Sequence, residues 1–309
     1  MLDTPAELDE DDAEGPDEEL DTDVGGVAPA PDQPIVTSDD AMTLDEARTL
    51  TGRRGGRLVL LMGEASTGKT ALSAALWQQM MEKGEIGAYR LAGSRTALGY
   101  ERRAHWTRLE ANQPGSDFPR TWDEDGGVVH LRVTRPDRER VELLLSDLTG
   151  EQFERIRKGR PLLEELPWAG RADRFAVLID GLTLSQPGHS EVPLSRAQRQ
   201  LQALQASRAV RPTARVAVLV TQADAITDQG QQALERHKPS LTQLAQAIDP
   251  EAVWLTSAAV PHDGSWPSGL EDVITWLCSD DRRLEPRALR LPEVTRAIGT
   301  LGLSGGDRR

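Results

Sequence analysis

The chain has a single cysteine, Cys278, among its 309 residues, and aromatic residues make up only 4% of it. One cysteine excludes an internal disulfide framework and fits a reducing compartment. Cys278 ends the apolar stretch Val273–Cys278, so we expect a buried structural thiol rather than a nucleophile. The five histidines are scattered without the spacing of metal ligands, and a zinc site would also lack cysteines.

Long apolar segments are absent as well. The longest apolar run, Leu58–Met62, is far too short to span a bilayer. The first residues are acidic and no apolar segment follows them, so the sequence shows no secretory signal. We therefore expect a soluble cytoplasmic protein with no membrane span.

Positive charge is missing from residues 1–40, which hold fifteen acidic residues and no Lys or Arg, whereas the other 269 residues hold 35 acidic and 36 basic ones. So acidic a segment cannot bury enough apolar surface to offset its ordering entropy. We expect residues 1–50 to form an acidic disordered tail and linker, residues 51–280 a folded domain, and residues 281–309 a polar tail. We interpret the acidic tail as a solubilising arm; docking on a basic partner is the alternative. Without a basic excess or many aromatics, direct nucleic-acid binding is not indicated.

From about Thr51, short apolar runs alternate with helical patterns, which is typical of an α/β domain with a largely parallel sheet. In the run 128–134, we expect Val129, Leu131 and Val133 to face the core and His130, Arg132 and Thr134 to face away from it. The expected strands are Arg57–Met62, Val128–Thr134, Val141–Ser146, Arg174–Asp180, Arg215–Thr221 and Ala252–Thr256. The expected helices are Lys69–Glu82, Leu98–Glu110, Ser195–Arg208, Asp228–His237, Leu241–Ile248 and Gly269–Cys278.

A phosphate-binding motif stands between the first expected strand and helix. Residues 63–70 read G-E-A-S-T-G-K-T and match G-x-x-x-x-G-K-[ST]. In such a loop, backbone N–H groups surround the phosphates and the helix N-terminus adds partial positive charge. We expect Lys69 to reach the β- and γ-phosphates and the Thr70 hydroxyl to ligate Mg²⁺. The predicted nucleotide-binding residues are Gly63, Glu64, Ala65, Ser66, Thr67, Gly68, Lys69 and Thr70, together with the next position, Ala71.

Two carboxylates are candidates for the acidic residue that a magnesium–phosphate site also needs. Asp147 follows the run 141–146 and opens a D-x-x-G sequence that ends at Gly150. We expect Asp147 to hold a magnesium water and the Gly150 N–H to sense a γ-phosphate. Asp180, at the end of the run 174–180, is the rival carboxylate that an ATPase would use, and an ordinary turn role for it stays open.

A base-reading motif is indicated near the C-terminal end of the domain. Residues 221–224 read T-Q-A-D and fit the guanine motif [NT]-K-x-D, except that Gln222 replaces the Lys. Asp224 would accept hydrogen bonds from guanine, although a helix cap or turn role is the alternative. Gln222 lacks the cation that normally bridges toward the phosphate loop. The later T-S-A sequence at residues 256–258 resembles the loop that backs the base with a main-chain N–H.

The order of these motifs over residues 57–279 resembles the TRAFAC class of P-loop GTPases. The resemblance implies a three-layer P-loop NTPase fold of the α/β class, with a mostly parallel sheet, one antiparallel strand and helices on both faces. Residues 92–103 and 147–151 further resemble the bacterial double-GTPase families of gene-clustered conflict and defence systems. That likeness implies GTP hydrolysis with Mg²⁺ as a switch in a multiprotein assembly, with GTP and GDP and so far unidentified proteins as partners.

The catalytic residues that the resemblance indicates are Lys69, Glu151, Gln152 and Arg95. The position after D-x-x-G often holds a glutamine that orients the attacking water, but here Glu151 comes first and Gln152 second, so we expect slow intrinsic turnover. Arg95 is a candidate internal arginine finger, with a solvated loop arginine as the alternative. Thr121 is the expected magnesium-closing threonine and Thr96 its rival. A non-hydrolysing nucleotide-gated scaffold and an ATPase that uses Asp180 remain as alternative functions.

Overall fold

The computed structural model describes residues 35–37, 39–54, 56–112, 127–207, 210–261 and 265–280. Most of the expected acidic tail, the expected polar tail and Thr121 lie outside these residues. Helices and strands alternate along the rest of the chain, as the apolar patterning predicts. No helix in the described part combines the length and apolarity needed to cross a bilayer.

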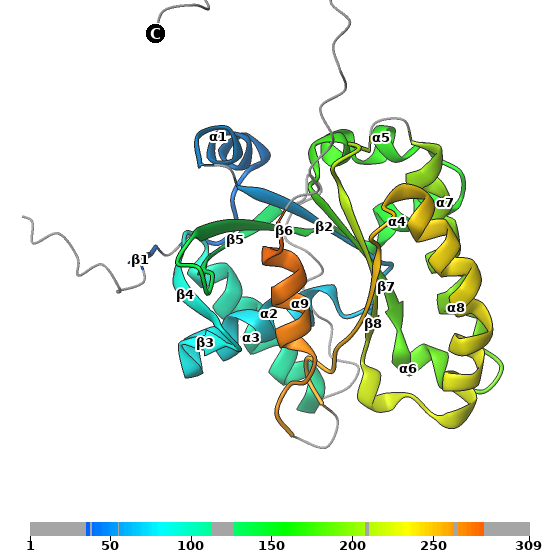
Figure 1. The fold of residues 1–309 in the computed structure, drawn as a ribbon. Coiled ribbons are helices and arrows are strands. Elements are labelled where there is room, and N and C mark those ends of the chain that lie inside the picture. Colours follow the sequence, from blue (N-terminus) through cyan, green and yellow to red (C-terminus); the bar gives the residue numbers. More distant parts are fainter. Residues whose placement is uncertain are drawn as a thin grey trace, which may run out of the picture. The chain divides into compact units, whose positions relative to one another are not determined.

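One sheet forms the centre of the described residues, in the strand order β1-β4-β5-β6-β2-β7-β8-β9, with β3 paired to β4 (Figure 1). Strands β6, β2, β7, β8 and β9 are parallel, whereas β5 runs antiparallel to both β4 and β6. This confirms the α/β fold with a mostly parallel sheet. The strands are β1 (Ile35–Val36), β2 (Arg57–Met62), β3 (Glu85–Ile86), β4 (Tyr89–Ser94), β5 (Gly127–Thr134), β6 (Arg140–Asp147), β7 (Arg174–Asp180), β8 (Arg215–Thr221) and β9 (Val253–Thr256).

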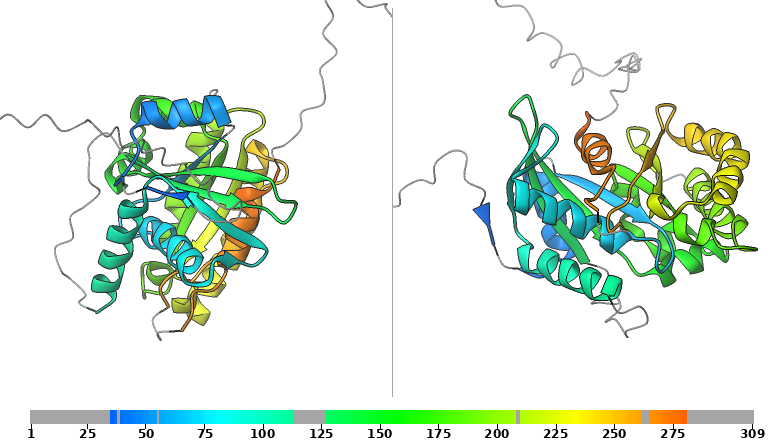
Figure 2. Two further views of the ribbon diagram at one scale, coloured as in Figure 1. Left: turned by 90° about the vertical axis from the view of Figure 1, so that its left-hand side faces the viewer. Right: turned by 90° about the horizontal axis from the view of Figure 1, so that it is seen from below.

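Helices cover both faces of the sheet (Figures 1 and 2). They are α1 (Leu44–Arg54), α2 (Lys69–Lys83), α3 (Ala97–Asn112), α4 (Gly150–Arg157), α5 (Leu162–Glu165), α6 (Gly181–Leu184), α7 (Glu191–Ala206), α8 (Asp228–Ile248) and α9 (Leu270–Cys278), with short 3₁₀ turns at Pro167–Arg171 and Ala223–Ala225. The helix α2 ends at Gly84, whose φ of 75° lies in the left-handed region, as a glycine stop predicts.

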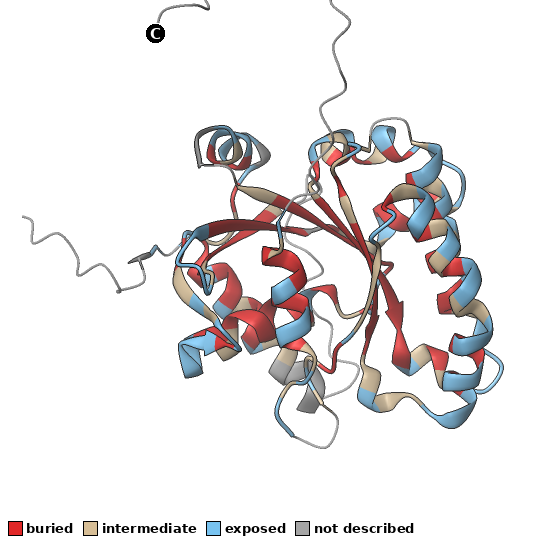
Figure 3. Ribbon diagram, in the orientation of Figure 1, coloured by how far each residue is buried: buried red, intermediate tan, exposed pale blue. Residues whose placement is uncertain are grey.

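Alternate residues of the strands pack into two separate hydrophobic cores, one on each face of the sheet. Figure 3 shows the strands as buried and the helices around them as partly exposed. In β2, Leu58, Leu60 and Met62 pack with α1, α4, α7 and α8. Val59 and Leu61 point the other way, against α2, α3 and α9. Burial on both faces explains why β2 reads as a continuous apolar run rather than an alternating one.

The prediction that His130 and Arg132 face away from the core was wrong, because both are buried, at 1% and 9% exposure. Their face of β5 is covered by the segment 39–54, which the sequence analysis had divided between the linker and the domain. Met42 pairs with Val128 through two backbone hydrogen bonds. Glu142 of β6 gives both side chains a partner: its carboxylate lies 2.5 Å from His130 Nε2 and 2.8 Å from Arg132 Nε.

A single helix, α8, replaces the two helices predicted at residues 228–237 and 241–248. Pro239 lies inside it and removes one backbone donor. The helix nevertheless continues, because Leu234, Leu241 and Ala245 on either side of the proline are buried in the core. Tertiary packing thus outweighs the local cost of the proline.

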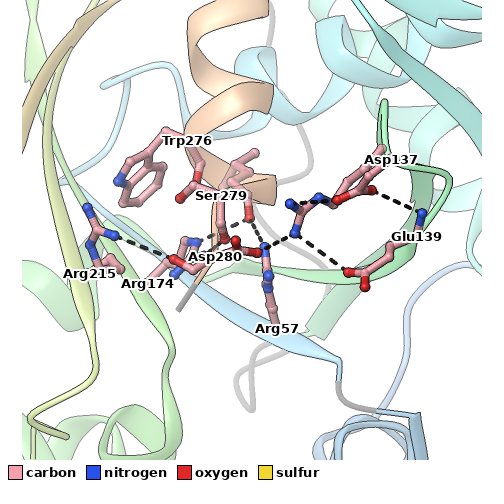
Figure 4. A network of polar contacts seen from close by, with 10 residues as sticks. Arg57, Asp137, Glu139, Arg174, Arg215, Trp276, Ser279 and Asp280 are labelled. Atoms are coloured by element: carbon pink, nitrogen blue, oxygen red, sulfur yellow. Dashed lines mark hydrogen bonds and ion pairs between the residues drawn. The ribbon is translucent and has the colours of Figure 1, made fainter. Parts of the chain in front are cut away.

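Arginines begin three neighbouring strands and gather at the end of α9 (Figure 4). Arg174, which is 0% exposed, donates from Nε to the Leu277 carbonyl oxygen at 3.1 Å and from a second nitrogen to the Ser279 carbonyl oxygen. Arg57 also donates to the Leu277 carbonyl, at 3.3 Å. These bonds satisfy carbonyls that the last turn of a helix leaves without partners, so α9 is fixed to the N-terminal edge of the sheet. Cys278, within α9, is fully buried as predicted, and burial raises the pKa of its thiol to about 12.

Candidate functional site: a phosphate-binding loop

The loop of residues 63–68 joins the C-terminal end of β2 to the N-terminus of α2. Ser66 and Gly68 have φ angles of 64° and 81°. Left-handed residues in such a loop turn successive backbone N–H groups into one concave surface, which suits an anion. A non-glycine residue such as Ser66 rarely adopts a positive φ, and strain of this kind collects at functional sites.

Lys69 is held across this loop. Its ammonium donates to the carbonyl oxygens of Gly63 at 2.5 Å and Glu64 at 2.8 Å, and the residue is only 8% exposed. The ring of Phe153 in α4 lies under the ammonium, 5.5 Å from it. A buried cation beside the N-terminus of α2 concentrates positive potential where the motif predicts phosphates.

The positions predicted for magnesium binding lie at the same edge of the sheet. Thr70 is exposed in the first turn of α2, and Asp147 is the last residue of β6, the strand that pairs with β2 in parallel. The described residues contain no cluster of three or more His, Cys, Asp or Glu that would hold a metal ion by themselves. Magnesium that arrives with a nucleotide takes most of its ligands from phosphate and water, so one Thr and one Asp at this edge of the sheet match the few protein ligands that such an ion needs.

Gly150, the last residue of the D-x-x-G sequence, lies directly on the phosphate-binding loop. A Cβ atom at Gly150 would stand 2.1 Å from the Ala65 nitrogen and 2.7 Å from the Glu64 carbonyl carbon. No side chain fits there, so glycine is required by contact with backbone rather than by its own φ. Gly150 also begins α4, and the N-terminal ends of α2 and α4 therefore meet at the loop.

The two candidate water-orienting residues point to different surroundings. Glu151 is exposed in the first turn of α4. Gln152 is 8% exposed, and its Oε1 has no hydrogen-bond partner in the described part of the chain. In this arrangement, Glu151 has the solvent access that water orientation requires, whereas Gln152 points into the protein.

Asp180 caps a helix. Its Oδ1 accepts from the backbone nitrogens of Leu182 at 3.0 Å and Thr183 at 3.2 Å, and its Oδ2 accepts from the Thr183 hydroxyl at 2.5 Å. Gln222 Nε2 adds a further bond to Oδ1 at 3.1 Å. A carboxylate with this many donors has little capacity left for a metal water, which favours the turn interpretation over a Walker-B role.

Gln222, which lacks the cation of the usual lysine, nevertheless contacts the phosphate-binding loop. Its Nε2 also lies 3.3 Å from the Ser66 carbonyl oxygen, and its own backbone is left-handed, with φ 49°. The neighbouring Thr221 hydroxyl donates to the Thr67 carbonyl at 2.9 Å. The end of β8 is therefore tied to the phosphate-binding loop by an amide and a hydroxyl instead of a lysine ammonium.

Asp224 is exposed in the short 3₁₀ turn that follows β8. The T-S-A loop lies beside it, because Ala223 N–H donates to the Ser257 carbonyl at 3.2 Å. Within the T-S-A loop, the Ala258 N–H donates to the Ser268 carbonyl at 3.1 Å. The structure thus brings the two predicted base-reading segments together, with this N–H in a backbone pair.

Arg95 is exposed at the end of β4, at the same sheet edge as the phosphate-binding loop. Three strand spacings, about 14 Å, separate β4 from β2, and no contact between Arg95 and the loop is found among the described residues. Thr96 is buried at 0% exposure, and its hydroxyl accepts from the His130 N–H at 2.8 Å. Thr96 thus has a structural partner, and Thr121 lies outside the described residues.

One group of site residues was missed by the sequence analysis. Glu64 is only 7% exposed, and its two carboxylate oxygens pair with Arg157 Nε at 2.5 Å and Arg196 Nε at 3.0 Å. We call these three residues the Glu64 ion cluster. The only signal in the sequence was an acidic residue inside a phosphate-binding motif, where a negative charge needs compensation.

A family model described as Double-GTPase 2 matches residues 57–277. No curated protein matched the chain. Among solved structures, translation elongation factor SelB from Methanococcus maripaludis, in complex with the GTP analogue GppNHp, is similar at 12% identity and a TM-score of 0.41. The match covers 74% of this chain and 35% of the elongation factor, so the chain spans about a third of that protein's length. The signal recognition particle receptor SRb-GTP/SRX complex from Chaetomium thermophilum is similar at 14% identity and a TM-score of 0.40, over 72% of this chain and 96% of that one.

Proposed function

The chain belongs to the Double-GTPase 2 family, and on that premise we propose that residues 51–280 form a GTP-binding and GTP-hydrolysing switch. The observation that carries the proposal is the contact of Gly150 with the backbone of Ala65. It sets the start of α4 against a loop that is built for phosphates. A γ-phosphate that accepts hydrogen bonds from backbone N–H groups of both segments would hold α4 in place, and its loss on hydrolysis would release it.

Each predicted residue has a role in this proposal. Lys69 binds the β- and γ-phosphates and stabilises the charge that develops during phosphoryl transfer. The Thr70 hydroxyl would ligate the magnesium ion that GTP carries, Asp147 would hold one of its waters, and the ion would neutralise phosphate charge. Asp224 accepts hydrogen bonds from guanine, and Glu151 orients the attacking water. Because a glutamate beside the γ-phosphate is repelled by it, we propose that intrinsic turnover is slow.

A non-hydrolysing, nucleotide-gated scaffold is the second candidate, and the burial of Gln152 favours it. The two candidates separate in a single-turnover assay with GTP and Mg²⁺. Hydrolysis that falls in Glu151→Ala and persists in Gln152→Ala supports the switch and the role of Glu151. If neither substitution changes the rate of hydrolysis, these two residues have no part in catalysis. If the unmodified protein does not hydrolyse GTP at all, the result favours the scaffold. In line with its resemblance to conflict and defence families, we place either activity in a bacterial multiprotein system with partners yet to be found.

The experiment that tests nucleotide choice is a titration with fluorescent GTP and Mg²⁺, followed by competition with unlabelled GTP and ATP. We expect tight competition by GTP, weak competition by ATP, and loss of this preference in Asp224→Asn. Equal competition by ATP, unaffected by the substitution, would refute the guanine assignment and favour an ATPase.

A further inference from the structure

The Glu64 ion cluster joins three parts of the domain that are far apart in sequence. Glu64 is the second residue of the phosphate-binding loop, Arg157 ends α4, and Arg196 lies in the second turn of α7. Both guanidiniums meet one carboxylate, at 2.5 and 3.0 Å. The side chains of Arg157 and Arg196 are 24% and 36% exposed, whereas that of Glu64 is 9% exposed, so the carboxylate is the buried centre of the cluster.

A buried carboxylate beside the predicted γ-phosphate position would by itself oppose an anionic ligand. With two arginines, the cluster carries a formal charge of +1 next to the loop, so its charge is compatible with phosphate. Glu64 therefore has a use that a neutral residue at this position would not supply, because it draws two cations and the two helices that carry them to the loop.

The two helices that carry the arginines also hold two buried polar atoms without partners in the described residues. Gln152 in α4 has a buried Oε1 with no partner in the described residues, and so has Gln200, one helical turn beyond Arg196 in α7. Buried polar atoms without partners weaken an interface. By contrast, Phe153 packs under Lys69 and Gly150 touches Ala65. The position of α4 thus depends on the core packing of Phe153 and Ile156 and on the Glu64–Arg157 pair, which is the ion pair that joins α4 to the loop.

We propose that Glu64 is a positioning residue that sets the preference for GTP over GDP. Through Arg157 it holds α4 on the loop with Gly150 facing the γ-phosphate position, while Arg196 anchors the same carboxylate to α7. GDP has no γ-phosphate to accept a hydrogen bond from the Gly150 N–H, so its binding does not depend on where α4 lies. This inference rests on the proposed GTP-binding function.

The test compares dissociation constants for a non-hydrolysable GTP analogue and for GDP, both with Mg²⁺, on the full chain. Glu64→Gln and Arg157→Gln are expected to weaken binding of the GTP analogue about 5- to 10-fold and binding of GDP less than about 2-fold. This difference lies at the lower end of usual coupling energies. The double variant is expected to match Glu64→Gln, because replacing Arg157 removes no further contact to a carboxylate that is already gone. Arg155→Gln is the matched control: Arg155 lies in the same helix and pairs at 2.6 Å with Glu165 in α5, away from the loop.

If Glu64→Gln weakens binding of both nucleotides equally, Glu64 has a merely structural role and the proposal is overturned. The same holds if the ratio of the two dissociation constants does not change in Glu64→Gln. Hydrogen exchange of the nucleotide-free protein adds a readout of the cluster itself: exchange in α4 is expected to accelerate in Glu64→Gln, with α2 unchanged, and equal exchange in the two proteins would overturn the positioning role. If the unmodified protein binds neither guanine nucleotide, the proposed function fails and the role of Glu64 with it. If it binds them with a ratio that Glu64→Gln does not alter, only the role of Glu64 fails.

Discussion

The side-chain amide of Gln222 lies 3.1 Å from Asp180 Oδ1, between the ends of two neighbouring strands. The same nitrogen donates to the Ser66 carbonyl in the phosphate-binding loop, at 3.3 Å. A neutral amide can make both bonds because it has two N–H donors. A residue that departs from the guanine motif thereby ties the base-reading segment to the loop.

Replacing Gln222 by alanine is expected to weaken binding of GTP and GDP equally, by about 3- to 10-fold, because the bond to the loop is lost together with the bond to Asp180 that positions the amide. Titration with each fluorescent nucleotide measures this change. Gln231→Ala serves as the control, since the Gln231 side chain donates to Glu235 on the exposed face of α8, at 3.0 Å. Weakening of GTP alone would assign Gln222 to the γ-phosphate rather than to the loop.

Gly150→Ala is expected to weaken binding of a GTP analogue at least about tenfold. The added Cβ meets backbone atoms of Ala65 and Glu64 that cannot rotate away, so α4 must move off the loop. Gly52→Ala in α1 is the control, because nothing lies within 4 Å of a Cβ there, and alanine favours a helix by about 1 kcal/mol over glycine. Unchanged binding in Gly150→Ala would show that α4 is free to shift without affecting the phosphate site.

Acid stability is expected to depend on Glu142. Burial raises the pKa of this carboxyl, but hydrogen bonds from His130 and Arg132, with their charges, outweigh it and lower the pKa from 4.5 to about 2. A carboxyl with a lowered folded-state pKa contributes stability that is present above pH 4.5 and is lost as the pH falls toward 2. Urea unfolding at several pH values would measure this loss.

Glu142→Gln isolates that contribution from those of other acids. At pH 7 it is expected to lower the free energy of unfolding by about 3 to 5 kcal/mol, because a buried ion pair loses one partner. The difference between the two proteins should shrink as the pH falls below 4.5. A difference that stays constant down to pH 2 would mean that the carboxylate charge does not stabilise the fold.

Strands β2, β7 and β8 have the bounds that the sequence predicts, because each is a continuous apolar run that ends in turn-forming residues. Strand β4 was missed: its sequence Y-R-L-A-G-S shows neither alternation nor an apolar run, and it depends on pairing with β5. The phosphate-binding loop is local in sequence and was predictable. The pair of Glu64 and Arg157 spans 93 residues, and no local pattern records which distant side chains will meet. For the same reason, the burial of His130 could not be foreseen without knowing that the segment 39–54 covers it.

The arginine cluster at the opposite edge of the sheet is expected to support stability but not nucleotide binding. Arg174 is fully buried and donates to the carbonyls of Leu277 and Ser279 (Figure 4). Arg174→Met should lower the free energy of unfolding by about 2 to 4 kcal/mol, because buried carbonyls at the end of α9 lose their donors. Arg57→Met should lower the free energy of unfolding less, since Arg57 makes a longer bond, 3.3 Å, to a carbonyl that Arg174 already satisfies.

Strands of six or seven residues, about 20 Å long, separate these arginines from the phosphate-binding loop, so neither substitution should change nucleotide affinity. Urea unfolding and GTP titration of both variants would check the two expectations. A nucleotide affinity that falls in Arg174→Met while the protein remains folded would show that the end of α9 is coupled to the phosphate site through the sheet.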